Sequence, residues 1–135
     1  MFTINQIKEA HSKVKSGADF PNYIYDIKNL GVEKYETYVA DGHSVYYDKS
    51  NFKIFSEPKY DVLKIENTSN ETQFSNDLKT HQQGKTNYLT FCNDCAKSGI
   101  EKWIVDISKM TCTYFDIKGN EILVETIPSL IKSKS

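Results

Sequence analysis

An internal repeat constrains the fold more than any other feature of this sequence. From residue 20 onward, positions separated by 68 residues match in character. Val32-Glu33-Lys34-Tyr35 aligns with Ile100-Glu101-Lys102-Trp103 in this way. Tyr46-Tyr47-Asp48 aligns with Tyr114-Phe115-Asp116. The first helix of each half aligns at a separation of 67 residues instead of 68. One single-residue gap therefore aligns the two halves along their whole length. Self-similarity of this length indicates that one supersecondary unit occurs twice.

Each half has the pattern of two helices followed by three strands. Apolar residues at helical spacing predict helices that end at Gly17, Gly31, Gly84 and Gly99. The expected N-caps of these helices are Thr3, Asp19, Thr68 and Thr86. Strand-like segments between turn residues are expected over 32–39, 43–47, 51–55, 100–107, 111–115 and 121–125. A further strand is expected over residues 60–65.

These elements predict an α+β fold in which helices pack on one face of an antiparallel sheet. Two ααβββ repeats, residues 1–66 and 67–128, are expected to be related by a pseudo-twofold axis. A half of roughly 65 residues is marginal alone, so both halves should share one core in a single domain over residues 1–135. The Lys- and Ser-rich tail at residues 129–135 is expected to fray.

Composition and charge exclude several classes of protein. Hydrophobic residues make up 39% of the chain, which is typical of a globular protein. No apolar run could span a bilayer, no signal peptide is visible, and three cysteines make no disulfide framework, so we expect a cytoplasmic protein. All seventeen basic residues are Lys and the net charge is −1. We therefore expect neither a membrane nor a nucleic acid as partner.

Several segments also resemble a known family. The motifs are Val14-Lys15-Ser16-Gly17-Ala18-Asp19-Phe20, Gly31-Val32-Glu33-Lys34-Tyr35 and His81-Gln82-Gln83-Gly84-Lys85-Thr86, together with the run over residues 88–114. They are similar to the bacterial domain-of-unknown-function family 1398. The resemblance implies an α+β fold and a bacterial, prophage-related origin, and members often carry the label "phage envelope protein". It implies no catalytic residues.

Cys92-Asn93-Asp94-Cys95 is the motif most suggestive of chemistry. The expected helix start places Cys92 in the second turn, beyond most of the effect by which a helix N-terminus stabilises a thiolate. Cys92 and Cys95 also align with Ile24 and Ile27, which favours two buried core positions. A redox pair or a metal site remains open as an alternative. We expect no metal and no cofactor, since no second ligand pair accompanies the motif.

A polar turn distinguishes the two halves. Asp41-Gly42-His43 stands where the second half has Lys109-Met110-Thr111, and a binding site need survive in only one copy of a repeat. His43 is the residue there that can change charge near neutral pH. We therefore name His43 and Asp41, with Tyr46 and Tyr114, as candidate ligand-binding residues. A solvated turn without a function is the alternative.

The leading functional hypothesis from the sequence is a non-enzymatic binding or interaction module. Its partner would be an unknown protein or small molecule, and a homodimer formed through the sheet is open. The alternative is a cofactor-free enzyme or a small-ligand-binding protein with a groove between the repeats. Tyr35, Tyr38, Tyr46, Trp103 and Tyr114 serve either core packing or such an aromatic groove or interface.

Overall fold

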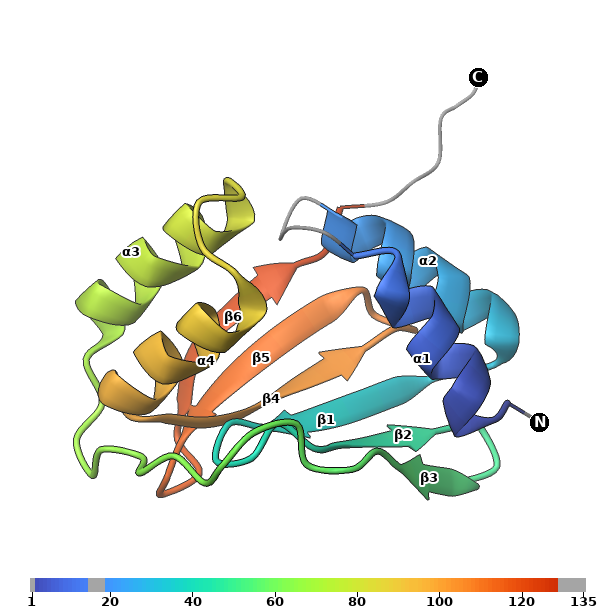
Figure 1. Ribbon diagram of the computed structural model, residues 1–135, viewed down its shortest axis with the longest axis horizontal. Helices are drawn as coiled ribbons and strands as arrows, with labels where there is room; N and C mark the ends of the chain where they lie inside the picture. Colours follow the sequence, from blue (N-terminus) through green and yellow to red (C-terminus); the bar gives the residue numbers. More distant parts are fainter. Residues whose placement is uncertain (1, 15–18, 129–135) are drawn as a thin grey trace.

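The structure is a computed structural model that describes residues 2–14 and 19–128. These residues form four helices and six strands in the order ααβββααβββ (Figure 1). The α+β fold with helices on an antiparallel sheet is therefore confirmed. The tail expected to fray, residues 129–135, lies outside the described residues. None of the described helices is long enough and apolar enough to cross a bilayer.

The helices form two antiparallel pairs. Their bounds are α1 Ile4–Ser12, α2 Phe20–Leu30, α3 Glu71–Gln82 and α4 Tyr88–Lys97. Helix α1 packs against α2, and α3 packs against α4. The capping box predicted at Thr3 is present, because the Thr3 hydroxyl accepts from the Gln6 N–H at 3.2 Å and Gln6 Oε1 accepts from the Thr3 N–H at 2.9 Å. Gly31 ends α2 in a left-handed conformation, as its position predicted.

The strands form one six-stranded antiparallel sheet in the order β3-β2-β1-β4-β5-β6. Their bounds are β1 Lys34–Tyr38, β2 Ser44–Tyr47, β3 Lys53–Phe55, β4 Ile100–Asp106, β5 Thr111–Asp116 and β6 Glu121–Thr126. The two halves of the chain meet at the centre, where β1 pairs with β4 and Glu36 lies opposite Ile104. Alternating side chains of β1 face opposite sides of the sheet, and Tyr35 and Thr37 are buried.

Some predicted boundaries are wrong. The first helix ends at Ser12 rather than Gly17, and Gly17 lies outside the described residues. The N-caps of α3 and α4 are Asn70 and Asn87, whose side chains accept from the Gln73 and Thr90 N–H groups at 3.0 and 2.8 Å. Asparagine caps a helix as well as threonine does, so the predicted caps at Thr68 and Thr86 were each displaced by a neighbouring residue.

Residues 60–65 form no strand, which corrects a further prediction. The Tyr60 hydroxyl donates to the Val39 carbonyl at 2.6 Å, and the Leu63 N–H donates to the Ala40 carbonyl at 2.7 Å. These bonds attach the segment to the turn after β1 rather than to an open strand edge. In Figure 1 it runs as a loop from β3 at one edge of the sheet toward α3 on the other side.

One hydrophobic cluster joins the helices to the sheet. It includes Ile24 and Ile27 of α2, Cys92 and Cys95 of α4, and Val105 of β4, each of them fully buried. All four helices lie on the same face of the sheet (Figure 1). The two helix pairs stand over different halves of that face, so the site between them lies above the central strands.

Candidate functional site

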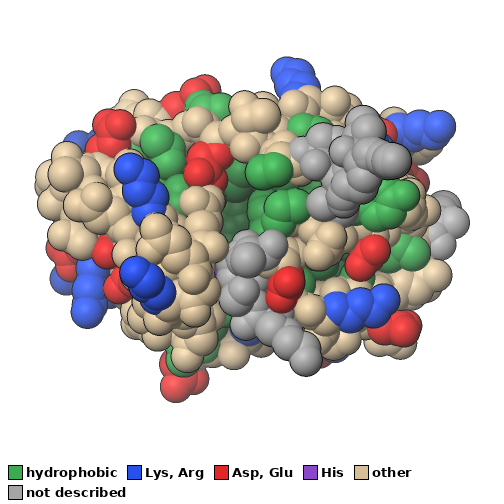
Figure 2. Space-filling model, turned by 90° about the horizontal axis from the view of Figure 1, so that it is seen from above, with side chains coloured by type: hydrophobic (Ala, Val, Ile, Leu, Met, Phe, Trp, Pro, Cys, Tyr) green, Lys and Arg blue, Asp and Glu red, His purple; other side chains and the backbone are tan. Residues whose placement is uncertain are grey.

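A cavity of about 650 Å³ opens between the two helix pairs. Pockets that bind small molecules are roughly 300–1,000 Å³, so this volume suits a small ligand. Figure 2 views the molecule from the helix side and shows hydrophobic side chains inside the opening between the pairs. The Phe, Tyr and Trp residues that line the cavity are Phe20, Tyr23, Tyr35, Tyr46, Tyr88, Phe91, Trp103 and Tyr114.

The aromatic rings of the cavity pack against one another. Tyr35 lies 5.2 Å from Tyr46 between ring centroids, and Trp103 lies 6.0 Å from Tyr114. Both separations are in the range in which rings attract one another through their edges and faces. Burial raises the pKa of Tyr23, Tyr35, Tyr88 and Tyr114 well above the usual value. These phenols therefore stay neutral and offer hydrogen bonds rather than charge.

Two buried hydroxyl groups form a polar spot on the cavity floor. Thr37 of β1 and Ser44 of β2 lie opposite each other in the sheet, and both side chains face the helices. Their hydroxyl oxygens are 2.7 Å apart, and each residue is only 2% exposed. A polar pair within an aromatic wall can orient a bound molecule, because its hydrogen-bonding groups have a fixed direction.

Two histidines lie in the cavity wall, one from each helix pair. The His11 ring of α1 meets the Tyr23 ring edge-on at 5.2 Å, and the His81 ring of α3 stacks on Phe91 at 4.5 Å. Burial lowers the pKa of both imidazoles, and nearby Lys59 lowers that of His11 further. Both rings are therefore neutral at pH 7, which suits aromatic packing.

Charged groups stand at different parts of the cavity lining. Lys59 enters from the loop after β3, and its pKa is lowered by burial. Glu125 enters from β6, where the Gln82 Nε2 donates to both of its carboxylate oxygens at 3.0 and 3.1 Å. The site thus combines an aromatic interior with a few fixed polar groups, which is the usual composition of a small-molecule pocket.

A family model described as "Protein of unknown function (DUF1398)" matches residues 8–126. The chain belongs to the DUF1398 family. It is also 18% identical over 115 residues to the "Uncharacterized protein YcgX" of Escherichia coli (strain K12), a match that covers 85% of this chain and 86% of the relative. The resemblance found in the sequence is thereby confirmed. Neither description contains a phage label, so the prophage origin and the cytoplasmic location stay predictions.

The DUF1398 structure separates the four candidate residues named from the sequence into two pairs. Tyr46 and Tyr114 both line the cavity, from β2 and β5. Asp41 and His43 lie together in the turn between β1 and β2, with Oδ1 and Nδ1 2.6 Å apart. The His43 ring stacks on Tyr38 at 4.7 Å, and neither His43 nor Asp41 lines the cavity. A ligand-binding role for Asp41 and His43 stays a prediction.

Cys92 and Cys95 are buried, as their alignment with Ile24 and Ile27 predicted, and Cys112 is buried as well. Cys92, Cys95 and Cys112 are free thiols with at most 2% exposure. Burial raises the pKa of all three, that of Cys112 to about 12, so a reactive thiolate is disfavoured. Across residues 2–14 and 19–128, no group of three or more His, Cys, Asp or Glu side chains is arranged to hold a metal ion.

Sequence reasoning missed the role of Lys59 in the cavity. The signal that selected His43 was an asymmetry between aligned positions of the two halves. The same comparison places Lys59 opposite Ile127, a charge against a buried apolar residue, and both residues line the cavity. His81 likewise aligns with an apolar residue, Val14, and the sequence favoured a position for His81 at the edge of the core.

Proposed function

We propose that this DUF1398 protein binds a small, largely aromatic molecule in the cavity between its helix pairs. The observation that carries the proposal is a cavity of about 650 Å³ with eight Phe, Tyr and Trp side chains in its lining. The proposed protein is a small-ligand-binding protein, as in the alternative raised by the sequence, and it is non-enzymatic, as in the leading hypothesis. The partner is then a small molecule rather than a second protein.

The apolar lining of this open cavity supports the proposal. Apolar side chains that face a water-accessible space are less favourably placed than side chains packed against other apolar groups, so a ligand that removes this surface from water gains free energy. Larger aliphatic residues at Thr37, Ser44 or Cys112 would shrink the space, yet small side chains line these three positions. A ligand with a planar ring system would restore the missing contacts with Tyr35, Trp103 and their neighbours.

Binding is favoured over catalysis because the described lining holds its phenols and its thiol in the protonated form, which leaves Lys59, with a pKa lowered by burial, and two imidazoles as its basic groups. Its phenols have raised pKa values, its thiol at Cys112 has a pKa of about 12, and both of its imidazoles have lowered pKa values. The carboxylate–imidazole pair of Asp41 and His43, which could act in proton transfer, does not line the cavity. A general acid or base needs a pKa near the working pH, which the neutral phenols and the thiol lack.

The proposed site sits between the two proposed repeats. The register of β1 and β4 supports a pseudo-twofold relation, because Glu36 lies opposite Ile104, the residue 68 positions later. The turns after β2 and β5 support it as well. The Asp48 carboxylate accepts from the N–H groups two and four residues later at 2.7 and 3.0 Å, and the Asp116 carboxylate does the same at 3.0 and 2.8 Å. On this view, Tyr46 and Tyr114 are equivalent walls of one cavity.

The test uses a neutral fluorescent probe, N-phenyl-1-naphthylamine, whose emission rises in apolar surroundings. We expect saturable binding that also changes the emission of Trp103, the one tryptophan of the chain and part of the cavity lining. The variant Ser44→Leu should weaken binding at least tenfold, because its side chain would enter the cavity. The matched control is Thr113→Leu, on the β5 residue between Cys112 and Tyr114, which does not line the cavity. Equal affinity in both variants would contradict the proposal.

Self-association through the open face of the sheet is the second candidate. Phe55 and Val124, on the two edge strands, are 59% and 53% exposed. Exposed apolar side chains on an uncovered sheet face can form a contact surface for a second copy of the chain. A dimer mass by light scattering that Val124→Glu converts to a monomer mass would support this candidate, and a monomer mass for the wild type would remove it.

A further inference from the structure

A smaller recess adjoins the aromatic cavity at the α1 side. It has a volume of about 240 Å³ and lies between α1 and residues 56–59 of the loop after β3. His11, Tyr46 and Lys59 line both spaces, so the recess continues the main cavity. A molecule that fills the aromatic space can therefore extend a group into the recess.

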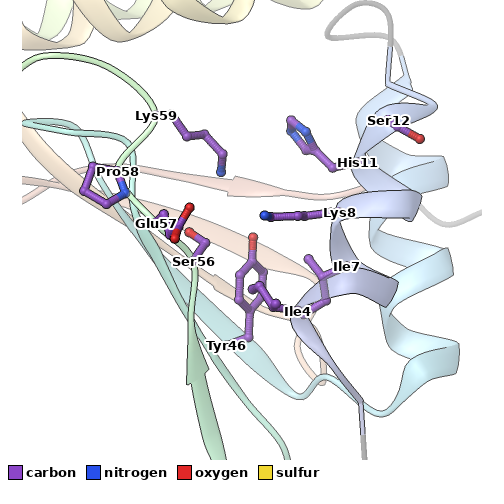
Figure 3. Close-up of a pocket in the computed structure, with 10 residues that line it drawn as sticks. All are labelled: Ile4, Ile7, Lys8, His11, Ser12, Tyr46, Ser56, Glu57, Pro58 and Lys59. Carbon is purple, nitrogen blue, oxygen red and sulfur yellow. The ribbon is translucent and has the colours of Figure 1, made fainter.

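Basic side chains converge on this recess. Lys8 and His11 are three residues apart on α1 and so share one side of the helix. Figure 3 shows Lys59 extending toward them from the loop, with the Tyr46 hydroxyl pointing into the same space. Although much of the Lys59 side chain is exposed, its ammonium group lies close enough to Lys8 for repulsion and close enough to His11 to disfavour a proton on that ring.

Among the described residues, no carboxylate forms an ion pair with these basic groups. The only ion pair among residues 2–14 and 19–128 is that of Asp41 with His43. Glu57 lines the recess but forms no ion pair with Lys8 or Lys59. Burial lowers the pKa of Lys59 and Lys8 lowers it further, while burial and Lys59 lower the pKa of His11. An anion placed between them would remove this repulsion.

On the basis of the proposed cavity, we infer that the ligand is an aromatic carboxylate whose acid group occupies the recess. Lys59 and Lys8 provide the charge, and the Tyr46 hydroxyl provides a hydrogen-bond donor for one carboxylate oxygen. The ring system then lies against Tyr35 and Trp103 in the main cavity. Glu57 also lines the recess, but the two positive charges of Lys8 and Lys59 outnumber its single negative charge. Glu125 lines the main cavity and not the recess, and it disfavours a second acid group there, so the ligand carries a single acid group.

The test compares two probes that share one ring system and differ in charge, 2-naphthoate and 2-naphthamide. Calorimetric titration at low salt gives the dissociation constant of each probe. We expect the wild type to bind the acid at least tenfold tighter than the amide, since a charge-assisted contact contributes about that factor. Lys59→Met should abolish this preference and leave the affinity for the amide within twofold of the wild type. Lys64→Met, on the same loop but outside both spaces, is the matched control and should keep it.

The outcomes separate this inference from the proposed function. Equal binding of both probes to the wild type would overturn the carboxylate and leave the cavity proposal standing. A preference that survives in Lys59→Met would overturn the assignment of the acid group to the recess. Failure of both probes to bind at millimolar concentration, together with no binding of N-phenyl-1-naphthylamine, would overturn the cavity proposal and this inference with it.

Discussion

Ser98, at the C-terminal end of α4, provides a sharp test of the packing described above. Its residue is 2% exposed, and its hydroxyl is the one buried side-chain oxygen or nitrogen within residues 2–14 and 19–128 that lacks a hydrogen-bond partner. Removing that hydroxyl with Ser98→Ala leaves the backbone bonds of the helix end in place, because the Ser98 N–H donates to the Asp94 and Cys95 carbonyls. We therefore expect this substitution to stabilise the protein.

The expected gain follows from the cost of burying a hydroxyl without a partner. That cost is about 1–3 kcal/mol in mutational data, so the free energy of unfolding of Ser98→Ala should rise by about 1 kcal/mol. For a chain of this size the corresponding rise in Tm is about 3 °C. Urea titration and differential scanning calorimetry measure both quantities.

Ser44→Ala is the matched control, because it removes the same chemical group from an equally buried position. The Ser44 hydroxyl lies 2.7 Å from that of Thr37, so its loss leaves a buried partner without its bond. We expect Ser44→Ala to lower the free energy of unfolding by about 1–2 kcal/mol. If Ser98→Ala also lowers stability, or if Ser44→Ala does not, the reasoning from hydrogen-bond partners is refuted.

Three further predictions test other parts of the structure. Because the pKa values of His11 and His81 are lowered from 6.5 in the folded protein, the unfolded chain takes up protons first on acidification, so the free energy of unfolding should fall between pH 7 and pH 5. Replacing both histidines by Gln should flatten this decline in urea titrations at several pH values. All three thiols should resist alkylation at pH 8 until urea unfolds the protein, as followed by mass spectrometry, and a rapidly labelled thiol would contradict their burial. Gly99→Ala should lower the free energy of unfolding by about 3 kcal/mol, because φ is +79° and the new methyl group would lie 2.6 Å from a backbone oxygen. Gly119→Ala, at φ +85° in open space, should lower it by about 1 kcal/mol, and urea titration of both variants measures the difference.

The repeat in the sequence predicted the helices and strands well, because periodic apolar residues report which side of an element is buried. Ile24 and Cys92, matched at a separation of 68 residues, are both fully buried. The caps were less predictable, since Asn87 and Thr86 are adjacent and both side chains can accept the bond from a helix N–H. Residues 60–65 carry a strand-like composition, but their bonds go to Val39 and Ala40 instead of a strand edge.

The cavity could be predicted only in part. Tyr46 and Tyr114 belong to the aromatic residues for which the sequence left either core packing or an aromatic groove open, and both line the cavity. The distance between the two helix pairs depends on how side chains pack, and the periodicity of a single helix or strand does not predict it. The position of Lys59 in the cavity lining was not predicted, because its loop has no periodic pattern that would place it beside α1. Asp41 and His43 lie away from the cavity because they belong to the turn between β1 and β2 and not to the strand residues that face the helices.

The central pairing of β1 with β4 has a consequence for synthesis on the ribosome. Strand β1 is complete at residue 38, but its partner is complete only at residue 106. At roughly 5–20 residues per second, the N-terminal half waits several seconds with β1 as an open edge. During that interval, β4 of another nascent chain could take the vacant place and produce an exchanged dimer. The charged side chains of Lys34 and Glu36 disfavour pairing of this open edge with an apolar strand of another protein, but they do not exclude β4 of a second copy, which is their native partner.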